Sequence, residues 1–470
     1  MSLKIPDPQV PKDNAKFVQN LTGKEHVGLD AKGRLYVVKD ALKSLEFLSD
    51  SKVFQPAIHQ RIGEALQDFW KTKNVKLITE QKVFYDKLID NLSKMELLSA
   101  DNQILLVKGF YEQRYQTLIG KGNPVFVAES MVTIEMSQDP HVSESVKTLI
   151  RPKLTDSGVN GTYITKDRLG NNIGVFKPMD EEAYMPNSPR ENMAMEYDPE
   201  NIRRDARLGH LQGSGWQKEV AAWMIDRGNI AGIPETVVLS IPFPKRLGAQ
   251  DALLKQGSLQ QFVSGIAIEG FSDKELCKLP ARQIQQLAVL DLIIGNADRN
   301  WGNVFWNETT QKVIPIDHGF SLLDSLEWRE DNLKPESEMN CHWYLLPQLA
   351  QPLPEDLGLK VHALNSDQLA VKLRALKLPE GSIRELKIRL MVFQKALKNG
   401  YNLAEITLML MPIERKCLVD EWSAETIQKC QQFKGQWNTL SKELAERKQF
   451  KVYFELLQKH VDNALRKNYV

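Results

Sequence analysis

The chain has 470 residues, of which 42% are hydrophobic, so it is long enough for two or three folded domains. Its 61 basic and 60 acidic residues give a formal net charge of +1, which excludes a global field of the kind that attracts nucleic acid. No apolar run is long enough to cross a bilayer, and the N-terminus lacks the apolar core of a signal peptide.

The four cysteines (Cys277, Cys341, Cys417 and Cys430) lie far apart and form no C-x-x-C pair. This spacing argues against a zinc site and against a disulfide framework, and it favours a reducing compartment. We therefore expect a cytoplasmic protein, with peripheral contact to membranes as an open alternative. A secretion signal read by a specialised machine, as in a bacterial effector, would escape this test.

Apolar residues recur at three- and four-residue steps through residues 1–145, which predicts a helical region. From Thr155 the pattern changes to short β-type runs separated by turn signals, and residues 155–182 predict a hairpin. The next stretch, to residue 215, is rich in Pro, Asn, Arg and Gly and predicts an irregular surface segment.

A helix is expected from near Ser214 to Gly228, followed by strands within residues 235–243 and 251–263. Helices dominate from Lys274 to the end. The last segment has one apolar helical stripe, formed by Phe450, Phe454, Leu457, Val461 and Leu465. The order predicts an α+β fold with two lobes and flanking helices, divided into a helical region (1–145), a β-rich N-lobe (146–263), an α-rich C-lobe (264–400) and a C-terminal helical region (401–470).

Two β-type runs, 304–306 and 313–316, flank the polar stretch "NETTQK" and predict a hairpin. Asn303 and Asp317 then stand at its open ends, where antiparallel pairing brings α-carbons within about 5 Å. Oxygen ligands of this kind suit a hard cation such as Mg²⁺. The sequence therefore predicts a divalent metal site at the base of this hairpin.

Asp298 precedes Asn303 by five residues, the D-x-x-x-x-N spacing that kinases use to place a catalytic aspartate beside a metal ligand. Gly319 completes a D-x-G motif. Lys177 closes a β-type run and is a candidate phosphate contact, with Glu219 as its candidate carboxylate partner. Each residue alone is more often ordinary surface or turn chemistry, but their order along the chain predicts a kinase.

These motifs resemble the type II phosphatidylinositol 4-kinases and the plant γ-type phosphatidylinositol 4-kinase-like proteins, some of which act on protein substrates. The resemblance covers residues 155 to about 355 and rests on "GVFKPMDEEAYMPNSPR", "KEVAAWMID", "GSLQQFV", "AVLDLIIGNADRNWGNVFW", "VIPIDHGFSL" and "HWYLLPQLAQPL". It implies a small, two-lobed, protein-kinase-like fold that uses ATP with Mg²⁺ or Mn²⁺.

The resemblance also implies roles for individual residues. Asp298 would be the catalytic aspartate, and Lys177, paired with Glu219, would contact the α and β phosphates. Asn303 and Asp317 would hold the metal ions. The hinge beside the adenine would be formed by Gln261, Phe262 and Val263. Apart from the resemblance, the turn before the first strand is a candidate to cover the phosphates with its backbone N–H groups (Ser157, Gly158, Val159, Asn160 and Gly161).

We expect a kinase that transfers the γ-phosphate of ATP to a hydroxyl acceptor. The sequence leans to a protein serine or threonine as the acceptor, with phosphatidylinositol as the alternative. The interval from Met179 to Gln217 has no cysteine, whereas type II lipid kinases carry a palmitoylation cluster there, and this difference favours the protein acceptor. The segments "GVFKP" and "QQFV" favour the lipid. A third alternative is an inactive scaffold that binds nucleotide or phosphoinositide, although the lysine and both aspartates of the kinase set are present.

Basic residues gather in two places, as Arg151 with Lys153 and as Arg203, Arg204 and Arg207. Arginine forks fit phosphate oxygens, so these residues are a candidate site for an inositol phosphate or a phosphoinositide headgroup. A solvated loop is the open alternative.

Overall fold

The structure is a computed structural model, and it divides the chain into two compact units. The first unit is Met1–Arg151 with Lys166–Asn171, and the second is Pro152–Thr165 with Asn172–Val470. The described residues are 26–29, 35–38, 86, 89, 100–156, 158–183, 185, 187–190, 210–244, 252–324, 341–410, 454–455, 458–459, 461–463 and 465.

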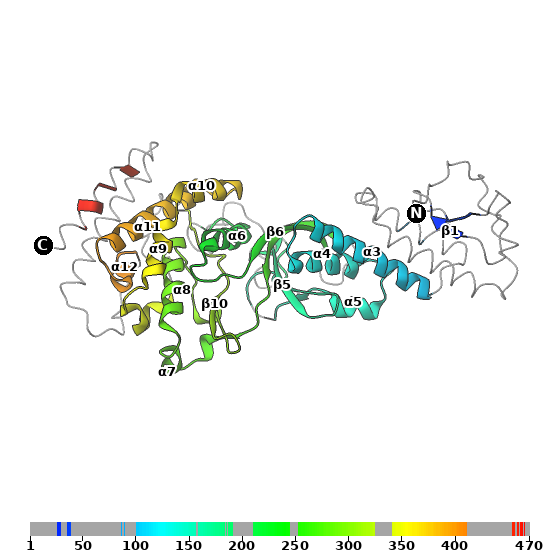
Figure 1. Cartoon of the computed structure of the whole chain (residues 1–470), viewed down its shortest axis with the longest axis horizontal. Coiled ribbons are helices and arrows are strands. Elements are labelled where there is room, and N and C mark those ends of the chain that lie inside the picture. Colours follow the sequence, from blue (N-terminus) through cyan, green and yellow to red (C-terminus); the bar gives the residue numbers. More distant parts are fainter. Residues whose placement is uncertain are drawn as a thin grey trace. The chain divides into compact units, whose positions relative to one another are not determined.

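The described part of the first unit is mainly helical, as the apolar periodicity predicts. It contains α3 (Ala100–Gly120), α4 (Val125–Gln138) and α5 (Glu144–Ile150), and α4 packs against both neighbours (Figure 1). An antiparallel ladder of β1 (His26–Leu29) and β2 (Leu35–Val38) was not expected in this region.

The turn at residues 166–171 belongs to the helical unit because α3 and α4 hold it. The Arg168 guanidinium donates to the Glu129 carboxylate through Nε (3.0 Å) and Nη2 (2.7 Å), and its Nη1 donates to Glu112 (2.6 Å). Thr133 Oγ1 donates to the carbonyl of Lys166 (2.7 Å). Charge-assisted bonds of this kind are the strong ones, so they fix the turn on the helices.

The second unit carries a five-stranded sheet in the order β3-β4-β5-β7-β6. Lys177 on β5 lies opposite Ser258 on β7. β4 lies beside β5, and β6 pairs with β7, so the hairpin and the strands expected in this region are confirmed. The strands are β3 (Lys153–Leu154), β4 (Tyr163–Lys166), β5 (Asn172–Pro178), β6 (Thr236–Pro244) and β7 (Ala252–Gln261).

Helix α6 (Gly215–Ile225) packs against β6 and β7. Its N-cap is Ser214, as predicted, and the buried Glu182 carboxylate accepts the backbone N–H groups of Gly213 (2.8 Å) and Trp216 (3.2 Å). A carboxylate suits a helix N-terminus because the free N–H groups there carry partial positive charge. The α-helix ends at Ile225, and a 3₁₀ turn continues it to Gly228.

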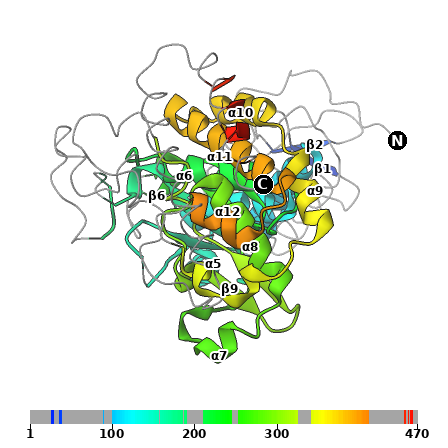
Figure 2. The same ribbon diagram turned by 90° about the vertical axis from the view of Figure 1, so that its left-hand side faces the viewer.

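The C-lobe is built around α8 (Ala281–Ile294), which packs against α11 (Glu380–Lys398) and α12 (Leu403–Leu410) (Figures 1 and 2). The described part of the lobe also contains α7 (Asp273–Leu276), α9 (Glu355–Ala363) and α10 (Ser366–Ala375), and four short 3₁₀ helices at Ile268–Gly270, Trp301–Asn303, His342–Leu345 and Pro347–Ala350. Val461 and Leu465 of the predicted C-terminal stripe join the same core, with Phe454 packed against it. Phe450 and Leu457 lie outside the described residues.

The second sheet has the order β10-β9-β8 and confirms the predicted hairpin. Val304 at the start of β9 lies opposite Pro315 at the end of β10, and the N–H of Ile316 donates to the carbonyl of Asn303 (3.1 Å). The strands are β8 (Ile266–Ala267), β9 (Val304–Asn307) and β10 (Lys312–Pro315), of which β8 was not expected. Within the described ranges, no helix is long and apolar enough to span a membrane.

Candidate active site

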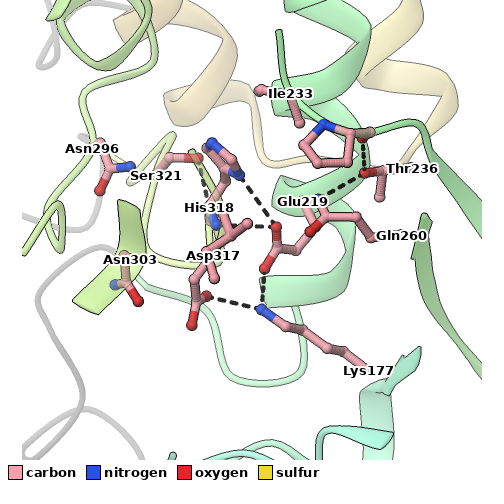
Figure 3. Close-up of polar contacts among 12 residues, drawn as sticks. Lys177, Glu219, Ile233, Thr236, Gln260, Asn296, Asn303, Asp317, His318 and Ser321 are labelled. Carbon is pink, nitrogen blue, oxygen red and sulfur yellow. Dashed lines mark hydrogen bonds and ion pairs between the residues drawn. The ribbon is translucent and has the colours of Figure 1, made fainter. Parts of the chain in front are cut away.

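Lys177 joins the two lobes of the second unit. Its Nζ atom contacts Oε1 of Glu219 on α6 and lies 3.0 Å from Oδ1 of Asp317, which follows β10 (Figure 3). The three residues come from separate parts of the chain, 42 and 140 positions apart. The structure therefore brings together the lysine, the glutamate and one of the two metal-site residues that the sequence singled out.

These contacts keep Lys177 and Glu219 charged at neutral pH. Burial lowers the pKa of Lys177, but the negative charges of Asp317 and Glu219 outweigh it and raise the pKa above its ordinary value. Burial raises the pKa of Glu219, yet the charge of Lys177 and the hydrogen bond from His318 leave it well below its ordinary value. Lys177 is thus a fixed cation at the end of a strand.

The second oxygen of Glu219 holds the segment after β10. Its Oε2 accepts the backbone N–H of His318 (3.0 Å), so one carboxylate contacts both Lys177 and the residue after Asp317. Asp317 has a φ of 53°, a left-handed conformation that is uncommon for a residue with a side chain. Glu219 therefore helps to hold Asp317 in a backbone conformation that surrounding contacts must stabilise.

The loop after α8 carries Asp298. Gly295 ends the helix in a left-handed conformation (φ 59°), and the Asn296 side chain then accepts the N–H of Asp298 (2.8 Å). Asn303 Nδ2 donates to the carbonyl of Asp298 (2.8 Å) and lies 3.4 Å from its carboxylate oxygen Oδ2. The two ends of the predicted D-x-x-x-x-N motif are therefore in direct contact.

Asn303 and Asp317 fit a magnesium ion by the chemistry of their donors. The amide nitrogen of Asn303 is used by Asp298, and Lys177 contacts one oxygen of Asp317, which leaves Oδ1 of Asn303 and Oδ2 of Asp317. Among the described residues, no group of three or more His, Cys, Asp or Glu could enclose a metal ion. Two oxygen donors suit a cation that keeps several waters and binds phosphates as well.

The candidate phosphate turn connects β3 to β4 and lies against the residues that follow Lys177. The N–H of Gly161 donates to the carbonyl of Glu181 (2.7 Å), and the Asn160 side chain accepts the N–H of Ala183 (2.9 Å). Gly158 (φ 99°), Val159, Asn160 and Gly161 are described, whereas Ser157 lies outside the described residues. The turn is thus placed at the Lys177 end of the sheet.

Sequence reasoning missed a buried network beneath this turn. Glu181 contacts Lys255 of β7 through Oε1 and accepts a hydrogen bond from the Tyr163 hydroxyl (2.5 Å) through Oε2, and all three side chains are buried. Burial is the main cause that raises the pKa of Glu181 and that of Tyr163. A buried lysine inside a strand is a signal that could have been read, but its partner lies 74 positions away.

The predicted hinge begins at Gln261, the last residue of β7, and continues through Phe262 and Val263. The N–H of Gln261 donates to the carbonyl of Glu235 (2.8 Å), and the N–H of Phe262 donates to that of Ile173 (2.9 Å), so the chain leaves the sheet at Val263. Contact of these residues with adenine stays a prediction.

The candidate headgroup site also stays a prediction. Arg151 lies 3.7 Å from Glu144, and Lys153 lies 3.3 Å from Asp156, so each of these cations has an acidic neighbour. Arg203, Arg204 and Arg207 lie outside the described residues.

The family model described as "Phosphatidylinositol 3- and 4-kinase" matches residues 158–406, more than half of the chain. The chain belongs to this family. The domain is a kinase domain with a two-lobed, protein-kinase-like fold, which agrees with the β-rich and α-rich lobes of the second unit. The resemblance stated from the sequence is confirmed.

Several plant proteins are relatives of this chain. Phosphatidylinositol 4-kinase gamma 4 of Oryza sativa is 28% identical over 303 residues, covering 60% of this chain and 50% of the relative. Phosphatidylinositol 4-kinase gamma 5 of Arabidopsis thaliana is 30% identical, covering 59% of this chain and 44% of the relative. Phosphatidylinositol 4-kinase gamma 2 of the same plant is 26% identical, covering 74% of this chain and 68% of the relative. The chain thus spans about half the length of the rice relative.

Proposed function

We propose that this protein transfers the γ-phosphate of ATP to the 4-hydroxyl of phosphatidylinositol. The proposal rests on one observation above all, the fixed Lys177 cation between Glu219 and Asp317 inside a domain of this family. The relatives are named phosphatidylinositol 4-kinases, which supports the lipid acceptor over the protein acceptor that the sequence favoured.

In this proposal each residue has a defined task. Lys177 binds the α and β phosphates of ATP, and the backbone N–H groups between Gly158 and Gly161 cover them. Asp298 accepts the proton of the attacking hydroxyl, with its backbone held by Asn296 and Asn303. The hinge at Gln261, Phe262 and Val263 binds the adenine.

Asn303 and Asp317 would hold Mg²⁺ or Mn²⁺ through their remaining oxygens. The ion, when bound, neutralises charge on the transferred phosphate. Lys177 contacts one Asp317 oxygen and so orients the other.

Two other functions remain as alternatives to the lipid kinase. A protein serine or threonine acceptor is supported by the cysteine-free interval from Met179 to Gln217. An inactive scaffold that binds nucleotide or phosphoinositide would account for the same fold without transfer. Both alternatives use the same nucleotide-binding residues as the lipid kinase. The three functions therefore differ only in which molecule, if any, receives the phosphate.

The deciding experiment supplies labelled ATP and Mg²⁺ or Mn²⁺ with phosphatidylinositol vesicles in one reaction and with a protein mixture in another. Asp298→Asn is the matched control, because it keeps the size of the side chain and removes the proton acceptor. We expect label in the lipid with the natural chain and none with the variant. Label only in protein would refute the lipid acceptor, and nucleotide binding without transfer to either would favour the scaffold.

A further inference from the structure

We infer that Arg299 is a positioning residue that holds both metal-binding residues, Asn303 and Asp317, in register. This inference rests on the proposed function, because it concerns the same site. Arg299 belongs to the loop of Asp298, but it does not face the reacting atoms. It is fully buried, with 0% of its side chain exposed.

The Arg299 guanidinium is anchored on α8. Its Nε donates to Oδ2 of Asp291 (3.0 Å) and its Nη2 to Oδ1 (3.3 Å), and Asp291 is also fully buried. Asn296 Nδ2 (3.1 Å) and Trp343 Nε1 (2.9 Å) donate to the same carboxylate. A buried ion pair persists when its remaining donors and acceptors are satisfied, and here they are.

The remaining nitrogen of the guanidinium reaches the hairpin of β9 and β10. Its Nη1 donates to the carbonyl of Asn303 (2.6 Å) and to the carbonyl of Ile316. These two residues are joined by the hydrogen bond that closes the hairpin base. One cation therefore fixes the backbone at both open ends of the hairpin.

The contact with Ile316 bears directly on Asp317. The Ile316 carbonyl belongs to the peptide group that enters Asp317, whose φ of 53° needs stabilising contacts. Glu219 holds the next peptide group through the N–H of His318. Asp317 is thus held on its N-terminal side by Arg299 and on its C-terminal side by Glu219.

An arginine is required for this arrangement. Its planar fork presents donors in fixed directions, so one end can pair with a carboxylate while the other bridges two carbonyls. A lysine ammonium at the same place can keep the charge but cannot reach Asp291 and both carbonyls together. The Arg299→Lys substitution therefore keeps the positive charge and removes the hydrogen bonds that depend on the shape of the guanidinium.

The test measures binding of a non-hydrolysable ATP analogue by calorimetry, with and without Mn²⁺. We expect Arg299→Lys to bind the analogue without metal within about twofold of the natural chain. Loss of an outer contact to a metal ligand typically lowers metal affinity by about 10–100-fold, so the gain in affinity that Mn²⁺ confers should fall by at least about tenfold. Asp291→Asn should also lower the gain in affinity that Mn²⁺ confers. It replaces Arg299→Lys in the test if that variant does not fold.

Arg282→Lys is the matched control, because Arg282 lies on α8, the helix that carries Asp291, and pairs with Asp356 on the surface. It should leave both affinities unchanged. An Mn²⁺-dependent gain that survives in Arg299→Lys would overturn the inference, as would an equal loss of affinity with and without metal. If Mn²⁺ does not raise the affinity of the natural chain for the analogue, the proposed function fails as well. The natural chain alone gives this result, so it is distinguished from a failure of the inference about Arg299.

Discussion

Glu219 is a buried charge and Lys177 is a partly buried one, and the loss of one should not be equivalent to the loss of the other. Lys177→Met leaves the Glu219 carboxylate without its ammonium, and removing one partner of a buried pair costs about 3–5 kcal/mol. Glu219→Gln leaves Lys177 with Asp317 and should be milder. We expect both to lower turnover by at least about 100-fold, the effect of losing one fixed electrostatic group.

Denaturant unfolding and labelled-ATP turnover check this prediction together. Lys312→Met, which removes an exposed lysine from β10, serves as the control and should change neither. Equal stability losses for Lys177→Met and Glu219→Gln would contradict the asymmetry between the two partners.

Gly161 approaches Glu181 so closely that no side chain fits between them. A Cβ at Gly161 would lie 2.5 Å from Glu181 Oε2 and 2.6 Å from its Cβ. Gly161→Ala must therefore displace the turn or the buried Glu181, and overpacking of this kind costs about 1–3 kcal/mol. We expect a higher KM for ATP with a smaller change in kcat, measured by steady-state kinetics.

Gly270→Ala is the control for that variant, because a Cβ at this exposed position meets no atom within 4 Å. An unchanged KM for ATP in Gly161→Ala would remove the turn from the nucleotide site.

Contacts at close spacing were predictable from the sequence. The distant pair of Lys177 and Glu219 could be named only from the order of the kinase motifs, and other distant partners could not be named. Asp298 and Asn303 are five positions apart, and their contact follows from the loop itself. The partner of Glu181 could not be read, because Lys255 reaches it only through the register of β7 beside β5. Short sequence separation makes geometry predictable, whereas strand register depends on the whole sheet.

At the scale of elements, the turn at residues 166–171 links the strands β4 and β5 but is held by α3 and α4. Arg168→Ala removes its bonds to Glu129 and Glu112, and hydrogen bonds to charged groups are worth about 1.5–3 kcal/mol. We expect a loss of that order in the free energy of unfolding. Denaturant unfolding of the full chain measures it.

A surface arginine gives the comparison for Arg168. Arg374 pairs with Glu380 through two hydrogen bonds on the protein surface, and exposed pairs contribute at most about 1 kcal/mol. Arg374→Ala should therefore be the milder variant. If Arg374→Ala lowered the free energy of unfolding more than Arg168→Ala, the helices would not depend on the turn for stability.

For the whole molecule, stability should fall at acid pH in part through Glu219. Its pKa in the folded protein lies below the ordinary value of 4.5, so its contribution is fully present above pH 4.5 and is lost as the pH falls below it. Glu219→Gln has no such group and should lose less stability between pH 5 and pH 3. Unfolding free energies across this range test the sign.

The exposed Glu308→Gln variant is the control and should follow the natural chain. A Glu219→Gln variant as acid-sensitive as the natural chain would show that the ion pair with Lys177 does not contribute to the acid dependence.

The sequence by itself determined the order of elements, the β9–β10 hairpin and the residues of the kinase motifs, because apolar periodicity and short spacings act over a few residues. Only the tertiary structure decided which distant residues contact those motifs. Arg299 binds carbonyls on both sides of the hairpin, and Lys177 meets a carboxylate 140 positions away. Such contacts form when separate elements pack into one core, and that packing is a property of the whole chain.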